Sequence, residues 1–363
     1  MDAPFCDELY DALCSFENLY KAHCRSRRGK RLKPEVIRFE MNLGARLHEL
    51  RKSLRDRLYA ISGYYAFQVH DPKERSIHAL HYVDRVVQHC LCDDVLGPHL
   101  LPRLIYDNAA CQPGKGTHFA LRRLTSFFAD YYKHHGTKGY ILKCDIRKYF
   151  ASIRHDILKQ KLARVFGKDA SFCALLDHII DSYAESPGCG LPLGNQTSQW
   201  FAVYYLDAFD RRIKERYRVR YYVRYMDDCV ILHHDRDFLK KIQAELALYL
   251  RELGLEFNKK TEIMPLKVGV DFLGWHYALR PTGKVVRRLR MATKKRYRKR
   301  IKALNQLVRS GRISMCDARA SIMSYYGHLK HGHTYRLRCA VMHKLLWNCV
   351  MVSSQVSHPQ KRA

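Results

Sequence analysis

Apolar and polar residues alternate along this chain with two periods, which together predict a mixed α+β fold. A helical spacing that includes Leu47, Leu50 and Leu54 predicts a helix over residues 34–57. Short runs rich in β-branched and aromatic residues predict strands over residues 64–69, 76–80, 140–146 and 270–279. Further helices are expected from about residue 119, twice within 155–185, and over 196–217 and 237–253.

Two adjacent aspartates stand between two of the apolar runs. The tetrapeptide Tyr225-Met226-Asp227-Asp228 follows the run 221–223 and precedes the run 229–232, a pattern that predicts a β-hairpin with paired negative charges at its turn. Adjacent like charges repel, so a fold that holds them together offsets the repulsion with cations. A two-metal phosphoryl-transfer site needs such oxygen ligands, although the tetrapeptide alone is equally consistent with an exposed turn.

The charge of the chain indicates a polyanionic partner. Its 363 residues include 65 Lys and Arg against 35 Asp and Glu, a formal net charge of +30. Such a surplus favours nucleic acid, whose phosphates bind basic residues with release of counterions. No apolar stretch approaches the ~18 residues of a membrane-spanning helix, and the first residues lack the basic segment of a signal peptide. We therefore expect a cytoplasmic protein with no membrane partner, whose 13 cysteines are reduced thiols.

The positive charge is concentrated near the C-terminal end. Residues 284–302 contain 11 Lys or Arg and no acidic residue. Apolar residues recur at helical spacing in the same region, at Tyr297, Ile301, Leu304 and Val308. The pattern predicts a basic amphipathic helix suited to lie along a phosphate backbone.

Three features occur in an order that is more specific than any of them alone. Asp145 ends an apolar strand, a loop rich in Gly and Pro over residues 186–194 leads into the segment 191–199, and the Asp227-Asp228 hairpin follows. In this order the chain resembles a reverse transcriptase from about residue 64 to residue 345. The resemblance implies an α+β right-hand polymerase, with a palm of antiparallel sheet backed by helices and an α-helical thumb.

The resemblance also implies a catalytic site with two Mg²⁺ ions, for which Mn²⁺ is a possible substitute. The implied metal ligands are the carboxylates of Asp145, Asp227 and Asp228 and the carbonyl of Ile146. Lys260 matches a catalytic lysine near the triphosphate. An aromatic ring at Phe150 would clash with a 2′-hydroxyl group and so favour deoxynucleotides.

Two further groups of residues are carried over from the family. The nucleotide-binding group comprises Lys73, Arg75, Arg147, Lys148, Tyr149, Phe150, Leu193, Gly194 and Gln199. The primer- and template-binding group comprises Tyr225, Met226, Phe272, Leu273, Gly274, Trp275, Arg287, Arg288, Lys294, Lys295 and Arg298. The implied domains are an N-terminal extension (1–34), fingers with fingers–palm helices (35–138), palm (139–283), basic helical thumb (284–350) and C-terminal tail (351–363).

One departure from the usual family pattern narrows the resemblance. Most reverse transcriptases carry Gln-Gly-x-x-x-Ser-Pro in the nucleotide-pocket loop, whereas this chain has Leu193 in place of the glutamine and Gln199 in place of the proline. This variant is similar to that of diversity-generating retroelement enzymes, and the segments 84–89, 114–118 and 326–334 also resemble that group. Leucine cannot form the hydrogen bonds that an amide forms at this position.

The narrower resemblance implies error-prone copying of template adenines in a retroelement RNA. The implied partners are template RNA and its hybrid with cDNA, deoxynucleoside triphosphates, and a small basic oligomeric accessory protein. A retron or group II intron-like enzyme of ordinary fidelity remains an alternative. So does a non-catalytic RNA-binding protein on a polymerase fold, although retention of all three aspartates argues against it.

Overall fold

The structure is a computed structural model that describes residues 7–70 and 74–341. The described residues form two compact units. The first is drawn from residues 7–70, 74–120, 142–231 and 237–262, and the second from residues 121–141, 232–236 and 263–341. The expected boundaries of fingers, palm and thumb stay predictions, and the predicted tail lies outside the described residues.

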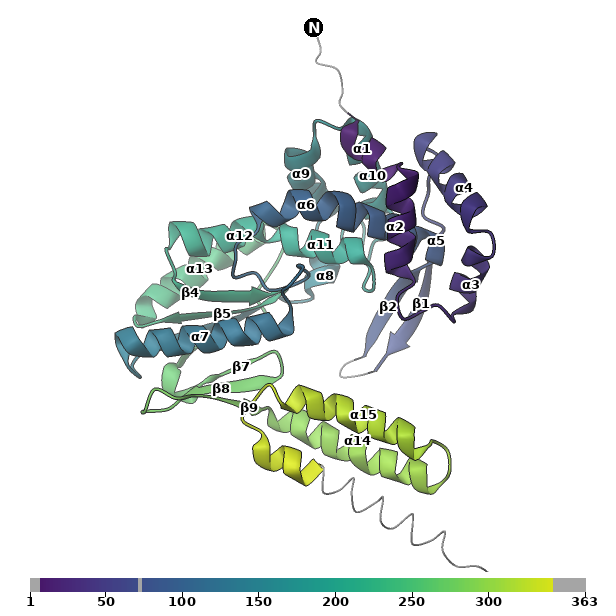
Figure 1. The fold of residues 1–363 in the computed structure, drawn as a ribbon. Helices are drawn as coiled ribbons and strands as arrows, with labels where there is room; N and C mark the ends of the chain where they lie inside the picture. Colours follow the sequence, from purple (N-terminus) through teal and green to yellow (C-terminus); the bar gives the residue numbers. More distant parts are fainter. Residues whose placement is uncertain (1–6, 71–73, 342–363) are drawn as a thin grey trace, which may run out of the picture. The chain divides into compact units, whose positions relative to one another are not determined.

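Helices make up the N-terminal part of the first unit (Figure 1). They are α1 (Glu8–Leu13), α2 (Phe16–Ser26), α3 (Pro34–Glu40), α4 (Leu43–Arg55), α5 (Tyr82–Cys90) and α6 (Gly97–Leu100), with a π-helical segment (Leu91–Leu96) joining α5 to α6 and a 3₁₀ turn (Leu101–Arg103) after α6. The prediction of one helix over 34–57 was wrong. Asn42, with φ −130° and ψ 43°, lies outside the helical region and separates α3 from α4, so that each helix buries its own apolar residues.

A two-stranded antiparallel hairpin follows α4 in the chain. Its strands are β1 (Tyr64–Val69) and β2 (Arg75–Leu80), with Tyr64 opposite Leu80 and Val69 opposite Arg75. Both strands were predicted from the sequence within one residue, because aromatic and β-branched residues on each side of a polar turn give a strong local signal.

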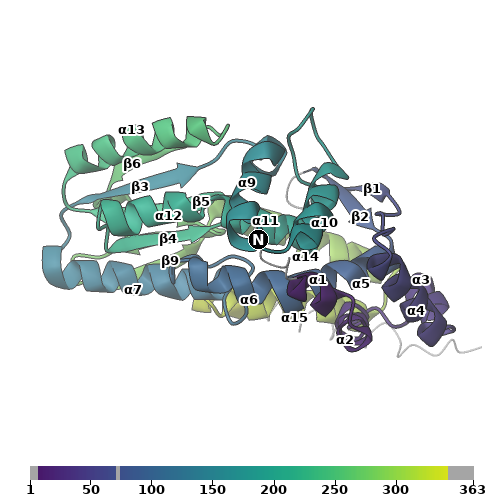
Figure 2. The ribbon, with the colours of Figure 1, turned by 90° about the horizontal axis from the view of Figure 1, so that it is seen from above.

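A four-stranded sheet carries the predicted site. Its strands are β3 (Tyr140–Asp145), β4 (Tyr221–Tyr225), β5 (Asp228–His233) and β6 (Glu262–Pro265), and their order across the sheet is β4-β5-β3-β6. The predicted Asp-Asp hairpin is confirmed as β4–β5. Helices α12 (Asp207–Arg211) and α13 (Arg236–Glu252) lie on one side of the β4–β5 hairpin (Figures 1 and 2).

The segment from β3 to β4 begins with four helices. They are α8 (Tyr149–Ser152), α9 (His155–Phe166), α10 (Ala170–Asp181) and α11 (Gln196–Tyr205), and α9 packs beside α10 (Figure 2). The side chain of Asp169 caps α10 by accepting a hydrogen bond from the Phe172 N–H at 2.8 Å. The predicted single helix over 196–217 is divided at Leu206, with φ −100° and ψ 16°, and the chain continues as α12 and a π-helical segment (Arg212–Arg216).

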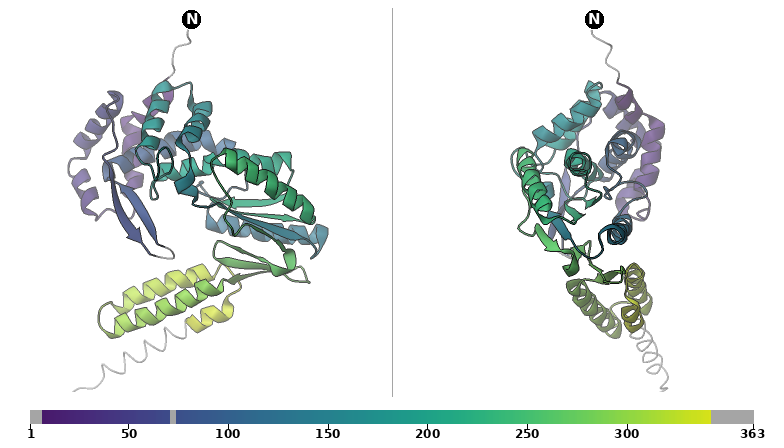
Figure 3. Two further views of the ribbon diagram at one scale, coloured as in Figure 1. Left: turned by 180° about the vertical axis from the view of Figure 1, so that it is seen from behind. Right: turned by 90° about the vertical axis from the view of Figure 1, so that its left-hand side faces the viewer.

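The second unit combines most of one long helix, a small sheet and a helix pair. Its elements are α7 (Thr117–His135, from residue 121 onward), a 3₁₀ turn (Leu266–Val268), β7 (Val270–Phe272), β8 (Trp275–Leu279), β9 (Val285–Leu289), α14 (Met291–Arg309) and α15 (Met315–Leu329). The three strands are antiparallel in the order β7-β8-β9. Helices α14 and α15 lie side by side in both views of Figure 3.

Two predictions in this unit were wrong. The expected strand over 270–279 is a hairpin, because Leu273 and Gly274 both have positive φ (46° and 85°) and reverse the chain between β7 and β8. The start of the basic segment is strand β9, which pairs Arg287 with Tyr277 and Arg288 with His276. The basic amphipathic helix itself is confirmed as α14, which begins at Met291.

Candidate active site

The predicted metal ligands lie at the adjoining ends of two neighbouring strands. Asp145 is the last residue of β3, Asp228 is the first residue of β5, and these strands are neighbours in the sheet. The backbone N–H of Ile146 donates a hydrogen bond to the carbonyl oxygen of Asp227 at 3.3 Å. This bond holds the turn of the Asp-Asp hairpin against the end of β3.

The side chains of Asp145 and Asp228 project from the same face of the sheet. Lys143 and Asp145 are two residues apart in β3 and therefore share a face. The Lys143 ammonium lies 3.8 Å from Asp228 Oδ1, which places Asp228 on that face too. The neighbouring Cys144 and Cys229 are buried, as expected of alternating positions that point the other way.

The donor chemistry of this group fits a divalent cation. Carboxylate and carbonyl oxygens are the hard ligands that Mg²⁺ prefers, and the Lys143 contact indicates that the Asp228 carboxylate attracts positive charge. Within residues 7–70 and 74–341, no three His, Cys, Asp or Glu side chains are already grouped as a complete metal site. The fit therefore concerns the kind and placement of the donors, and the identity of the metal stays a prediction.

Lys260 belongs to a loop that is fastened to Asp145. The Asn258 N–H donates to the Asp145 carbonyl at 2.6 Å, and the Asp145 N–H donates to Thr261 Oγ1 at 3.1 Å. The Lys260 N–H in turn donates to Asn258 Oδ1 at 3.2 Å. These bonds hold the exposed Lys260 in the same unit as the carboxylates, on a loop bonded to the backbone of Asp145.

The residues after Asp145 form a tight turn into α8. Arg147 is exposed near Glu256, 3.6 Å away, and Lys148 has a left-handed backbone with φ 44°. The Tyr149 ring is buried and its hydroxyl donates to the Ala202 carbonyl, so it cannot contact a nucleotide directly. Burial raises the pKa of Tyr149 well above its ordinary value. Phe150 is half-buried and remains available as the predicted sugar gate.

The predicted nucleotide-pocket loop contacts the β1–β2 hairpin. The His78 N–H donates to the Leu193 carbonyl at 2.9 Å. Gly194 has φ 119°, and a Cβ there would lie 2.8 Å from the Ile77 methyl group Cγ2, so glycine is required for both reasons. Arg75 is exposed on β2. Lys73 lies outside the described residues.

The two ends of this loop are also positioned by hydrogen bonds. The Leu191 N–H donates to the Phe150 carbonyl at 2.9 Å, which joins the loop to the predicted sugar gate. Gln199 is exposed on α11, and its Oε1 accepts a hydrogen bond from the Cys111 thiol at 3.0 Å. The structure thus brings Phe150, Leu193 and Gln199 together with the carboxylates in one unit.

A buried ion pair behind the turn was not predicted from the sequence. The Arg224 side chain is 1% exposed, and it forms two 2.7 Å hydrogen bonds to the carboxylate of Asp210, which is fully buried. Burial alone would lower the pKa of Arg224, but the charge and hydrogen bonds of Asp210 outweigh it and raise the pKa. An arginine inside the otherwise apolar run 221–225 was the signal that could have revealed this pair.

The remaining predicted residues of the hairpin are half-buried. Tyr225 and Met226 precede the aspartates, and Met226 adopts a left-handed backbone with φ 55°. Burial raises the pKa of the Tyr225 hydroxyl. Both side chains are therefore partly accessible to a bound nucleic acid.

The predicted primer-contact residues of the second unit differ in exposure. Phe272 and Trp275 are buried, and a Cβ on Gly332 would lie 2.1 Å from the Trp275 ring. The turn residues Leu273 and Gly274 between them are more accessible. Direct contact to a primer at this hairpin would therefore involve the turn rather than the two large rings.

Basic residues predicted to contact phosphate lie on β9 and α14. The Arg287 guanidinium lies 5.5 Å from the centre of the Trp275 ring, whereas Arg288 is exposed. Lys294 is half-buried, and Lys295 and Arg298 are exposed on α14.

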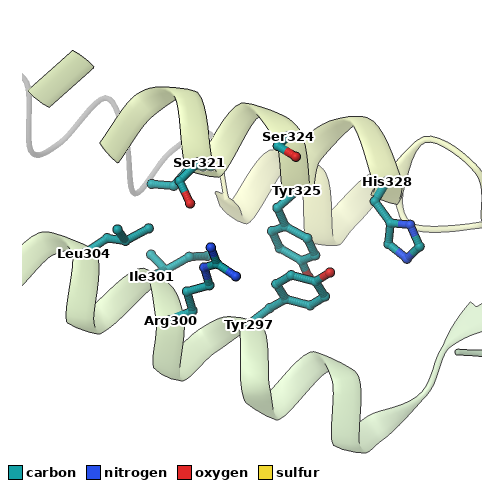
Figure 4. Close-up of a pocket in the computed structure, with 9 residues that line it drawn as sticks. Tyr297, Arg300, Ile301, Leu304, Ser321, Ser324, Tyr325 and His328 are labelled. Atoms are coloured by element: carbon teal, nitrogen blue, oxygen red, sulfur yellow. The ribbon is translucent and has the colours of Figure 1, made fainter. Parts of the chain in front are cut away.

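A pocket of about 320 Å³ opens between α14 and α15 (Figure 4). Its walls include the stacked rings of Tyr297 and Tyr325, whose centres are 3.4 Å apart, together with Arg300, Ile301 and Leu304. The predicted apolar stripe of α14 thus faces α15. The predicted phosphate-binding residues of α14 do not line this pocket.

No helix in the described part of the chain is both long and apolar enough to cross a membrane.

Residues 69–277 match the family described as reverse transcriptase (RNA-dependent DNA polymerase). Because the match covers more than half of the chain, this protein belongs to that family. The predicted α+β polymerase fold and the predicted resemblance to reverse transcriptases are therefore confirmed.

Solved structures to which this chain is similar include telomerases from two Candida species. The chain is 16% identical to an apo telomerase from Candida tropicalis truncated from its C-terminal domain, covering 62% of this chain and 55% of that one, with a TM-score of 0.48. It is 13% identical to a telomerase from Candida albicans in complex with a TWJ fragment of telomeric RNA, covering 81% and 60%, with a TM-score of 0.49. The chain thus spans little more than half the length of these telomerases. No curated protein sequence matches it.

Proposed function

We propose that this chain synthesises DNA on an RNA template. The observation that carries the proposal is the Ile146–Asp227 hydrogen bond of 3.3 Å, which joins two segments that bear the three aspartates. Asp145, Asp227, Asp228 and the Ile146 carbonyl are the proposed ligands of two divalent ions. When bound, such ions stabilise the negative charge that develops during phosphoryl transfer.

The other residues of the site have proposed roles in binding and selection. Lys260 binds the triphosphate, a role supported by the hydrogen bonds between its loop and Asp145. Phe150 excludes a 2′-hydroxyl group by its bulk. Arg75 and Arg147 are exposed cations of the same unit that would contact phosphate.

The proposed template is a retroelement RNA, which remains bound as a hybrid with the new cDNA. The formal charge of +30 and the exposed basic residues of α14 support binding to a polyanion. We further propose Mg²⁺ as the metal and a small basic oligomeric accessory protein as a partner. The last proposal rests on the sequence resemblance alone.

Leu193 supports the narrower proposal of error-prone synthesis opposite adenine. Its backbone carbonyl is engaged by His78, and its aliphatic side chain cannot donate or accept a hydrogen bond. A polar contact affects fidelity only when it differs between correct and incorrect nucleotides in the transition state. We propose that the contact missing at Leu193 is of that kind.

Extension of a primer on a defined RNA template tests the catalytic proposal. The wild-type protein should incorporate deoxynucleotides with Mg²⁺ and stop when EDTA is added, and Asp227→Ala should abolish incorporation while binding RNA normally. Asp237→Ala is the matched control, since Asp237 is an exposed aspartate paired with Lys240 on α13. RNA binding by the wild type without any incorporation would instead indicate a non-catalytic RNA-binding protein.

Sequencing of the products tests the narrower proposal. Leu193→Gln should lower misincorporation opposite template adenine more than opposite the other three bases. An unchanged error spectrum in that variant would exclude Leu193 as the fidelity determinant, without affecting the assignment as a polymerase.

A further inference from the structure

A buried arginine on strand β4, Arg224, contacts the turn of the β4–β5 hairpin. Besides its two bonds to Asp210, the Arg224 guanidinium donates from Nη1 to the Met226 carbonyl at 2.9 Å and from Nη2 to the Val203 carbonyl at 3.1 Å. One planar side chain thus binds a carboxylate on α12, the backbone of α11 and the turn between β4 and β5. Lysine, a single point charge, could not reproduce this geometry.

The carboxylate that holds Arg224 is itself fully engaged. Asp210 Oδ1 accepts a second hydrogen bond from the Tyr222 hydroxyl at 2.5 Å, and Oδ2 accepts one from Asn108 Nδ2 at 3.4 Å. All four side chains are buried. A closed polar network of this kind fixes the orientation of each member, because any other arrangement leaves a buried polar group without a partner.

The same network reaches the backbone of strand β4. The Arg224 N–H donates to the Asp107 carbonyl at 3.1 Å, and the Arg224 carbonyl accepts from the Ala109 N–H at 2.9 Å. The segment around Asn108 therefore pairs with β4 through its backbone and with Asp210 through its side chain. Both attachments limit movement of Arg224 relative to its strand.

The turn is fastened at two successive carbonyl groups from two directions. Arg224 binds the carbonyl of Met226, and the N–H of Ile146 binds the carbonyl of Asp227. Met226 also has a left-handed backbone, which a non-glycine residue adopts only when its surroundings hold it there. The backbone on both sides of the first turn aspartate is therefore fixed.

We propose that Arg224, oriented by Asp210, is a positioning residue that sets the direction of the Asp227 and Asp228 carboxylates toward divalent metal ions. The proposal rests on the proposed function of these carboxylates. Because Arg224 also binds Val203 of α11, it links the turn to the helix that begins just after the Leu193 loop. Because its side chain is only 1% exposed, Arg224 acts through the turn rather than by direct contact with a substrate.

A purely structural network would stabilise the fold without altering metal binding, and this difference provides the test. Partners that orient metal ligands typically change metal affinity or activity by about 10- to 100-fold when removed. Arg224→Lys keeps the positive charge but loses the forked contact to Asp210 and the Nη1 bond to the Met226 carbonyl. The double variant Arg224→Gln with Asp210→Asn removes both charges together, which avoids leaving one charge buried alone.

The matched control is Asp169→Asn. Asp169 is a similarly buried aspartate in the same unit, 1% exposed, and it binds the N–H groups of Leu9, Tyr10 and Phe172 far from the turn in sequence. Its loss should reduce stability without altering the carboxylates of the hairpin.

Mn²⁺ binding to the full chain, followed by electron paramagnetic resonance, gives a readout that does not depend on catalysis. Both Arg224 variants should bind Mn²⁺ about 10- to 100-fold more weakly, and in primer extension they should need correspondingly more Mg²⁺ for half-maximal rate. Asp169→Asn should match the wild type in both measurements. Folding of each variant is checked by circular dichroism at the assay temperature.

The outcomes separate the two proposals. Unchanged Mn²⁺ affinity and Mg²⁺ dependence in folded Arg224 variants would overturn the positioning role while leaving the polymerase assignment intact. Equal weakening by Asp169→Asn would also overturn it, since the effect would then follow general stability. If the wild type makes no cDNA, the proposed function fails, and the Mn²⁺ titration alone decides the role of Arg224.

Discussion

Two hairpins in this chain each turn on two residues, and they are held in different ways. The β7–β8 turn has positive φ at both Leu273 and Gly274, the backbone that best matches the twist of paired strands. In the β4–β5 turn only Met226 has positive φ, and neither central residue is glycine.

The difference lies in what supports each turn. The β7–β8 hairpin relies on favourable local geometry and on half-exposed ion pairs from Asp271 to His276 and Arg290. The β4–β5 hairpin relies on the buried Arg224–Asp210 pair and on Ile146. A turn that must present two like charges is thus fixed by distant parts of the chain, whereas an ordinary turn can be specified by its own residues.

The largest expected effect is a loss of stability when the buried Arg224–Asp210 pair, which supports the β4–β5 turn, is broken. Arg224→Met leaves the buried Asp210 carboxylate without its cation and should lower the free energy of unfolding by about 3–5 kcal/mol. Adding Asp210→Leu removes the orphaned charge and should restore a large part of this loss. Urea denaturation followed by circular dichroism measures both variants.

The control for that prediction lies in the other hairpin. Asp271 and its partners are more than a third exposed, so Asp271→Asn should cost no more than about 1 kcal/mol. If Arg224→Met and Asp271→Asn lowered the free energy of unfolding by similar amounts, the buried Arg224–Asp210 pair would not support its hairpin more strongly than the exposed pairs support theirs.

Local patterns in the sequence predicted the elements whose signals are local. The bounds of β1 and the existence of the β4–β5 hairpin were predicted from short apolar runs beside turn residues, and both were confirmed. The breaks at Asn42 and Leu206 were missed because neither residue is a strong helix breaker. The helices on either side of each break pack against different parts of the protein. The position of the break therefore depends on tertiary packing, which the local sequence does not reveal.

The candidate active site could likewise be predicted from the sequence only in part. The residue types at Asp145 and Asp227-Asp228 indicated metal-ligand chemistry, but the placement of β3 next to β5 is a pairing between distant segments. The partner of Arg224 could not be predicted, because Asp210 lies on a separate short helix. Burial of Tyr149 and Trp275 was likewise hidden, since large aromatic residues serve equally as contacts and as core.

A smaller effect is expected from the glycine of the β7–β8 turn. Gly274→Ala places a side chain at φ 85°, where no atom lies within 4 Å of the new Cβ, so the cost is purely that of the backbone. The free energy of unfolding should fall by about 1 kcal/mol. Gly44→Ala is the matched control: Gly44 is helical and equally uncrowded, and its replacement should raise stability by about 0.5–1 kcal/mol. A higher free energy of unfolding in both variants would contradict the view that the β7–β8 turn is specified by its own residues.

The smallest expected effect compares the two left-handed residues directly. Asparagine tolerates a left-handed backbone better than other non-glycine residues, so Leu273→Asn and Met226→Asn should each raise the free energy of unfolding by about 0.5 kcal/mol. Both side chains are half-buried and both have similar φ values, 46° and 55°, so the two gains should agree when measured by urea denaturation. Agreement would mean that the turns store the same local strain and differ only in their supports. A clearly larger gain at Met226 would mean instead that the Arg224 bond forces additional strain on the β4–β5 turn, and the contrast between the hairpins would then lie within the turns themselves.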